Sequence, residues 1–177
     1  MQKTLRFWAF PLLVLALGLG LSACKSAADK AVEKAVESTT GTDATVDSSS
    51  NKVSINTNGT SWETGDSVSL PANFPDDIYV VEGTIKVAIA NDATAGFTVS
   101  LETTKSVSEV KTLYQKELVD DGWTITGSYD IQGSSSVMAT KAKRSVTVTM
   151  GQNEDKTKSV VSINTYTDTT PSAPTTE

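Results

Sequence analysis

Apolar and polar residues alternate with a period of two along most of the chain after residue 40, a pattern typical of half-buried strands. The strictest case is residues 145–150, where Val146, Val148 and Met150 alternate with Ser and Thr. The pattern predicts strands at residues 43–47, 52–57, 60–64, 84–90, 96–103, 123–129, 135–141, 144–150 and 159–166. Asn58-Gly59 is the strongest hairpin signal, and short turns of this kind indicate antiparallel pairing.

A period of three to four residues predicts a helix over residues 107–121. Ser106 and Glu109 have the spacing of a capping box, and Gly122 is a typical residue just after a helix. The apolar stripe of this helix comprises Val107, Val110, Leu113, Tyr114 and Leu118. Its polar residues, expected to point to solvent, are Glu109, Lys111, Gln115 and Lys116.

Trp123 directly follows this helix and begins a predicted strand. A large aromatic ring at that junction is expected to pack where the helix meets the sheet. We therefore assign Tyr114, Leu118 and Trp123 to the structural core.

A second, shorter helix is predicted at residues 25–38, which are rich in Ala, Glu and Lys. Its apolar stripe is mostly Ala, which buries little area. The sequence favours a helical stalk or weak packing on the domain, and an amphipathic helix lying on a membrane is the alternative.

From residue 84 the predicted order is β-β-α-β-β-β-β, which indicates an α+β fold with an antiparallel sheet covered by one helix. A short helix and a small β-meander precede it. Residues 70–83 contain Pro71 and Pro75 and are expected to lie across the core as an extended segment.

The first 23 residues have the organisation of an export signal. Residues 1–6 carry two cations and no acid, and residues 7–21 are uncharged and almost wholly apolar. This apolar run is shorter than the roughly 20 residues that a spanning helix needs. The sequence therefore predicts a leader that is removed.

Leu21, Ser22, Ala23 and Cys24 stand where that leader ends. This quartet resembles the lipobox of bacterial lipoproteins. The resemblance implies that Leu21, Ser22 and Ala23 are recognised by a type II signal peptidase and that a diacylglycerol is attached to the Cys24 sulfur. It also implies N-acylation of Cys24 in many bacteria. An ordinary secretory leader and an uncleaved anchor are the alternatives.

Residues 70–165 resemble a class of small bacterial envelope lipoproteins. Leu70, Pro71, Phe74 and Pro75 match the start of that pattern, which ends in Tyr114, Leu118, Gly122 and Trp123. The resemblance implies an extracytoplasmic location and a fold, and it implies no activity. Lys25 after Cys24 allows an outer-membrane address where the organism has such a membrane.

These features divide the chain into five expected parts. They are a signal peptide (1–23), a lipidated N-terminus with a helical stalk (24–40), a small β-meander (41–69), an α+β globular domain (70–166) and a disordered tail (167–177), which is rich in Thr, Ser and Pro.

Composition narrows the chemistry. The chain has no His and one Cys, which excludes a Ser-His-Asp triad, a disulfide within the chain and zinc sites built from His or several Cys. The net charge of −6 disfavours nucleic acid as a partner. No cofactor motif is present, so we expect neither a metal nor a cofactor beyond the lipid on Cys24.

The carboxylates open to an acid–base interpretation lie near turns or helix ends: Asp76, Asp77, Glu82, Glu102, Asp120 and Asp121. For the Asp76-Asp77 pair, a turn with local hydrogen bonds is favoured over a metal or catalytic site. We therefore expect no enzyme, but a non-enzymatic binding or structural module of the cell envelope, with an envelope protein or a glycan as its partner. The alternatives are an assembly accessory that pairs through a sheet edge and a carboxylate-based hydrolase.

Replacing Cys24 by Ser is expected to leave the protein uncut and without lipid, because the hydroxyl cannot replace the thiol in the acylation. Labelled fatty acid and the mature size on a gel report the result in the native host. Label in the Cys24→Ser chain, or a mature product of unchanged size, would contradict the lipobox assignment.

Overall fold

The computed structural model describes residues 25–40, 42–47, 51–57 and 59–167. Its two helices are α1 (Lys25–Thr40) and α2 (Val107–Asp120). The strands are β1 (Asp43–Asp47), β2 (Lys52–Thr57), β3 (Thr60–Gly65), β4 (Thr84–Asn91), β5 (Gly96–Thr103), β6 (Thr124–Ile131), β7 (Ser134–Lys141), β8 (Arg144–Gln152) and β9 (Ser159–Thr167). The fold is α+β, as the sequence predicted.

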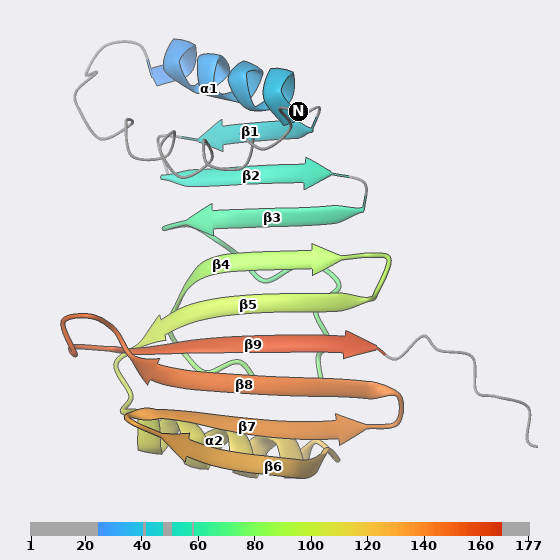
Figure 1. The fold of residues 1–177 in the computed structure, drawn as a ribbon, viewed down its shortest axis with the longest axis vertical. Helices are drawn as coiled ribbons and strands as arrows, with labels where there is room; N and C mark the ends of the chain where they lie inside the picture. The colour runs from blue at the N-terminus through green and yellow to red at the C-terminus, as the bar shows by residue number, and fades with distance from the viewer. Residues whose placement is uncertain (1–24, 41, 48–50, 58, 168–177) are drawn as a thin grey trace, which may run out of the picture.

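All nine strands form one antiparallel sheet in the order β1-β2-β3-β4-β5-β9-β8-β7-β6 (Figure 1). The sheet is therefore larger than the sequence predicted, because the strands of the small β-meander belong to it. β3 pairs with β4, with Trp62 opposite Ile89, so the meander extends the main sheet. A lone hairpin is marginal in water, and pairing with β4 supplies the support that β2 and β3 need.

The position of α2 follows from the strand order. The chain leaves β5, passes through α2, enters the sheet at its far edge as β6 and returns through β7 and β8 to β9. β9 then pairs with β5 in a register that puts Val99 opposite Ile163. This route lays α2 across one face of β6, β7 and β8 (Figure 1).

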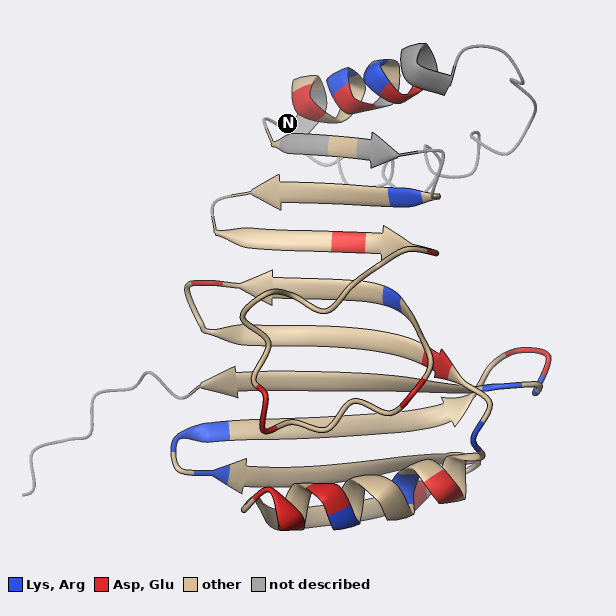
Figure 2. Cartoon of the chain, turned by 180° about the vertical axis from the view of Figure 1, so that it is seen from behind, with Lys and Arg blue, Asp and Glu red and all other residues tan. Residues whose placement is uncertain are grey.

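Residues 66–83, which we call the strap, cover that face over β4, β5 and β9. Figure 2 shows the strap crossing the sheet on the same side as α2. Two turns shape it, with Phe74 N–H donating to Pro71 O (3.0 Å) and Ile78 N–H donating to Pro75 O (3.2 Å). The extended segment expected across the core is therefore present, although Leu70 at its start is exposed.

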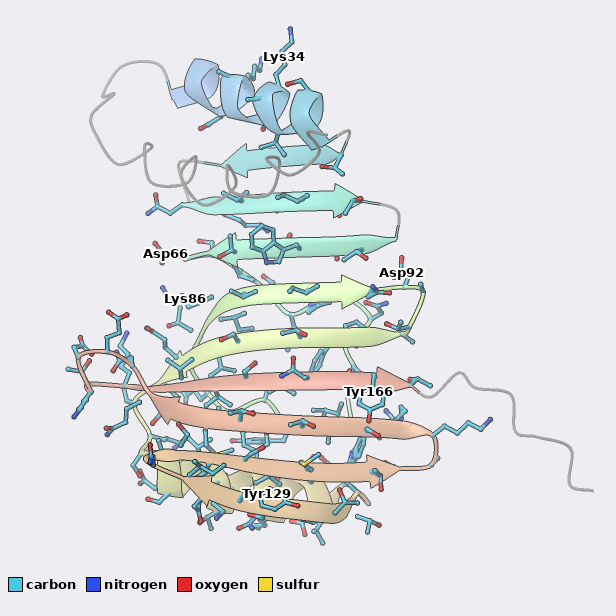
Figure 3. All side chains as sticks on the ribbon, viewed as in Figure 1. Lys34, Asp66, Lys86, Asp92, Tyr129 and Tyr166 are labelled. Carbon is cyan, nitrogen blue, oxygen red and sulfur yellow. The ribbon has the colours of Figure 1, made fainter. Side chains whose placement is uncertain are left out.

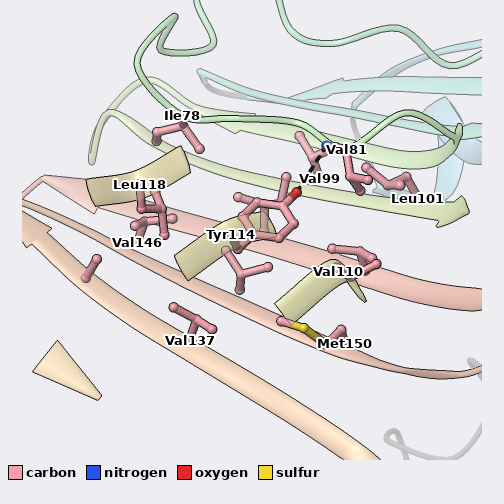
Figure 4. Packing of buried hydrophobic residues seen from close by; sticks show 14 of the residues in the cluster. Ile78, Val81, Val99, Leu101, Val110, Tyr114, Leu118, Val137, Val146 and Met150 are labelled. Atoms are coloured by element: carbon pink, nitrogen blue, oxygen red, sulfur yellow. Dashed lines mark hydrogen bonds between the residues drawn. The ribbon is translucent and has the colours of Figure 1, made fainter. Parts of the chain in front are cut away.

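The core lies between the sheet, α2 and the strap (Figure 4). Its buried members are Ile78, Val81, Val99, Leu101, Val110, Tyr114, Leu118, Trp123, Val137, Ala139, Val146, Val148, Met150, Val161 and Ile163. Tyr114 joins all three elements, because its ring is fully buried and its hydroxyl oxygen accepts a hydrogen bond from Val81 N–H (3.3 Å).

Local signals define α2 at both ends. Ser106 Oγ accepts from Glu109 N–H, and the Glu109 carboxylate accepts from Ser106 N–H (2.8 Å), which completes the expected capping box. Gly122 follows the helix with a φ of +81°, a left-handed conformation that glycine adopts without strain. Trp123 N–H then donates to Leu118 O (2.8 Å), so the chain turns directly into β6.

The sequence analysis predicted that the polar side chains of α2 point to solvent, and for two of them this prediction was wrong. Lys111 Nζ donates to Asp130 (2.6 Å) and Gln115 Nε2 donates to Ser128 Oγ (3.1 Å), and both partners lie on β6. The helical period in the sequence separates the apolar from the polar positions of α2. It does not reveal that some of the polar positions lie next to β6.

The opposite face of the sheet carries rows of polar residues in register across β5, β9 and β8. Thr98, Asn164 and Thr147 form one row, and Ser100, Ser162 and Thr149 form the next. Exposed aromatic side chains, including Tyr129 and Tyr166, lie on this face as well (Figure 3). In the described residues neither α2 nor the strap covers it.

Trp123→Ala is expected to lower the free energy of unfolding by about 3 kcal/mol or more, because it leaves a cavity in the core. Trp123 is only 3% exposed, whereas Trp62 is 37% exposed. Trp62→Ala is therefore a matched control that should cost clearly less. Urea unfolding measures both, and equal losses would show that Trp123 is not a core residue.

Candidate functional site

The residues of the predicted lipidation site, Leu21, Ser22, Ala23 and Cys24, lie outside the described residues. The described chain begins at α1, whose first residue Lys25 directly follows Cys24 in the sequence. Figure 1 places α1 beside β1, at one edge of the sheet.

Asp77 of the strap lies at the centre of a charged cluster. Its carboxylate accepts from Arg144 Nη1 (2.8 Å) and Nη2 (2.5 Å) and from Lys141 Nζ (2.7 Å). Its backbone carbonyl accepts from the Trp123 indole N–H (2.7 Å). The Arg144 guanidinium lies over the Trp123 ring, with Cζ 5.0 Å from the ring centroid. We call these four residues the Asp77 cluster.

Asp76 and Asp77 do lie in a turn, closed by the bond from Ile78 N–H to Pro75 O, but the Asp77 side chain does not make the expected local hydrogen bonds. Its side chain instead bonds to residues more than sixty positions away, at the ends of β7 and β8. The hydrogen bonds from Arg144, followed by those from Lys141, hold the pKa of the Asp77 carboxyl far below its usual range despite partial burial. Such a carboxylate is a poor base, and its contacts fasten the strap to the sheet.

The other carboxylates considered from the sequence do not converge with Asp77. Asp76 and Glu82 are exposed on the strap. Glu102 pairs with Lys158 (2.9 Å), and Asp120 pairs with Lys116 (2.6 Å) on α2. Asp121 meets the cluster only through its backbone carbonyl, which accepts from Lys141 Nζ (2.7 Å).

A groove of about 750 Å³ lies between the first half of α2 and the β6–β7 hairpin. Its lining is mainly hydroxyl and amide side chains. The lining residues are Ser106, Val107, Ser108, Lys111, Thr112, Gln115, Asp130, Ile131, Gln132, Gly133, Ser134, Ser135 and Gln152.

The charges in the groove neutralise each other. Lys111 Nζ lies 2.6 Å from one oxygen of Asp130, and Ser135 Oγ donates to the other oxygen at 2.6 Å. The bond from Lys111, followed by the bond from Ser135, lowers the pKa of the Asp130 carboxyl. The groove therefore offers polar groups with no net charge from this pair, which suits a neutral polar ligand.

Sequence reasoning named Asp77, Trp123 and Lys111, but it did not single out their partners Lys141, Arg144 and Asp130. Lys141, Lys143 and Arg144 form the most basic short segment after residue 24, and its charge is opposite to that of the distant Asp76-Asp77 pair. That complementarity was the available signal for the Asp77 cluster. Nothing local marked Asp130, because its partners lie on α2 and β7.

A START domain-like family model matches residues 82–158. This region is under half of the chain and contains β4, β5, α2, β6, β7 and β8. No curated protein and no solved structure matches the chain.

Within the described ranges, no helix combines the length and apolar character needed to cross a membrane. The same residues include no group of three Cys, Asp or Glu side chains placed to hold a metal ion.

Asp77→Asn is expected to lower the free energy of unfolding by about 1–2 kcal/mol at pH 7, since it weakens charge-assisted bonds. A folded-state pKa below the unfolded value of about 4 means that this stabilisation is complete above about pH 5. It is lost as the pH falls, because the unfolded chain takes up the proton first.

The difference in unfolding free energy between wild type and Asp77→Asn should therefore shrink below about pH 4. Other carboxyls contribute equally to both proteins and cancel. Urea unfolding from pH 7 to pH 3 measures the difference, and a constant value over that range would show that the Asp77 ion pairs do not stabilise the fold.

Proposed function

We propose that this chain is a membrane-anchored, extracytoplasmic lipoprotein whose folded domain is a non-enzymatic binding module of the bacterial cell envelope. The anchor is the lipid on Cys24, inferred from the sequence of residues 21–24. Two or more acyl chains, at about 0.8 kcal/mol per buried methylene, hold a domain at a bilayer when one chain does not. Helix α1 then links the anchor to the sheet.

The binding role rests on one observation. Every residue that lines the polar groove lies within residues 82–158, the part that matches the START domain-like family model. A large concavity with several converging polar groups is the preferred starting hypothesis for a ligand site.

The lining of the groove selects the ligand class. Hydroxyl and amide groups from α2 and from the β6–β7 hairpin can donate and accept hydrogen bonds, while Val107 and Ile131 offer apolar contact. The internally paired charges of Lys111 and Asp130 leave little attraction for an ion. A neutral, hydroxyl-rich molecule such as a glycan fits this chemistry.

Two observations support a role without catalysis. The Asp77 carboxylate is occupied by Arg144 and Lys141, and the Asp130 carboxylate by Lys111 and Ser135. A carboxylate with a lowered pKa and no open coordination is a weak general base. This argues against the carboxylate hydrolase.

The β6 edge of the sheet argues against an assembly role by strand addition at that edge. The outer strand β6 has a bulge between Ile125 and Gly127, which breaks the regular row of backbone groups that a partner strand would need. Asp130 near the end of β6, which bonds to Lys111 of α2, adds a charged side chain to this edge.

Thr112→Trp is expected to abolish glycan binding in the groove, because the exposed Thr112 lines the groove and an indole there would fill it. Val119→Trp is the matched control. Val119 is an exposed, uncharged position on the same helix outside the groove lining.

Titration of the folded, unlipidated domain with chitotetraose and maltotetraose, followed by backbone amide NMR shifts, measures both variants. Shifts confined to groove residues in wild type and Val119→Trp, and lost in Thr112→Trp, support the proposal. Absence of binding to wild type, or equal binding by Thr112→Trp, contradicts the assignment of the groove.

A further inference from the structure

A second concavity lies where the strap crosses the ends of β8 and β9, and it shares no lining residue with the groove. Its volume is about 240 Å³. Its walls include Pro75, Ile78, Phe97, Trp123 and Arg144, which come from the strap, β5, the segment after α2 and β8. This pocket is therefore largely apolar with one cation in its wall.

The charge balance beside the pocket favours an anion. Two cations, Arg144 and Lys141, share the single carboxylate of Asp77, so the Asp77 cluster has one positive charge in excess. Low-dielectric walls strengthen the attraction of such a surplus charge for a ligand.

Arg144 also has hydrogen-bond donors to spare. A guanidinium has five N–H donors, and Asp77 accepts one from Nη1 and one from Nη2. Among the described residues, the Arg144 side chain makes no hydrogen bond other than those to Asp77. Its position over Trp123 and its bonds to Asp77 hold the remaining donors in a fixed plane.

We propose that this pocket binds a small carboxylate with an apolar body, which places its carboxylate on Arg144 and its body against Trp123, Ile78 and Phe97. The pocket is separate from the groove and does not depend on the lipid anchor. It goes beyond the proposed glycan site, because its ligand is charged and amphiphilic rather than neutral and polar.

Octanoate is the probe, and 1-octanol, which has the same chain without the charge, is its control. The Trp123 indole N–H resonance reports binding in the pocket, and the Trp62 resonance on the opposite face serves as an internal reference. Octanoate should shift the Trp123 signal saturably, and octanol should bind at least about tenfold more weakly, as expected for a lost charge-assisted bond.

Asp77→Asn and Arg144→Gln form a matched pair, because each breaks the same ion pair and should affect stability similarly. Their effects on octanoate should be opposite. Arg144→Gln should weaken binding by about tenfold or more. Asp77→Asn should bind octanoate as tightly as wild type or more tightly, since a competing carboxylate is gone.

Arg144→Gln leaves Asp77 paired with Lys141 alone. Should that variant fail to fold, the double variant with Asp77→Asn, which has no carboxylate at this position, replaces it. It should bind octanoate about tenfold more weakly than Asp77→Asn alone.

Equal binding of octanoate and octanol, unchanged binding after loss of Arg144, equal loss in Asp77→Asn, or no binding to wild type would each overturn the proposal. The Thr112→Trp variant distinguishes binding in this pocket from binding in the groove. Thr112 lines only the groove, so this variant should bind octanoate as wild type does.

Discussion

Covering the apolar face that strands β4 to β9 share is the constraint that shapes this protein. A helix of 14 residues is about 21 Å long and lies over β6, β7 and β8. The apolar residues of β5 and β9, such as Val99 and Ile163, need a second cover, and the strap provides it. Because the strap contains no helix or strand, its contacts with neighbouring elements must hold it in place. Asp77 and Val81 make those contacts with Trp123, Arg144 and Tyr114.

The two concavities lie where these covers end. The groove opens beside the first half of α2, where polar side chains of the helix meet the β6–β7 hairpin. The smaller pocket opens where the strap passes the ends of β8 and β9, and there Arg144 both fastens the strap and faces a cavity. Residues that stabilise the cover thus also give each concavity its chemistry, neutral and polar in one case and cationic and apolar in the other.

Local patterns in the sequence predicted the elements well, and they failed for contacts between distant segments. Alternation placed the strands within a few residues, and Ser106, Glu109 and Gly122 defined the ends of α2. A period of two tells which residues share a face, but it does not tell which strand lies alongside. The pairing of β3 with β4 across the strap and the long-range partners of Asp77 were therefore missed. The same limit applies to Lys111, whose partner is on β6.

Hydrogen exchange at the Trp123 indole tests most directly whether the strap is an integral cover. This N–H donates to Asp77 O (2.7 Å), so it exchanges only when the strap leaves the sheet. We expect it to exchange as slowly as the backbone amides of central β9, such as that of Ile163, and far more slowly than the indole of the partly exposed Trp62. Exchange of the Trp123 indole at the rate of the Trp62 indole would contradict the account.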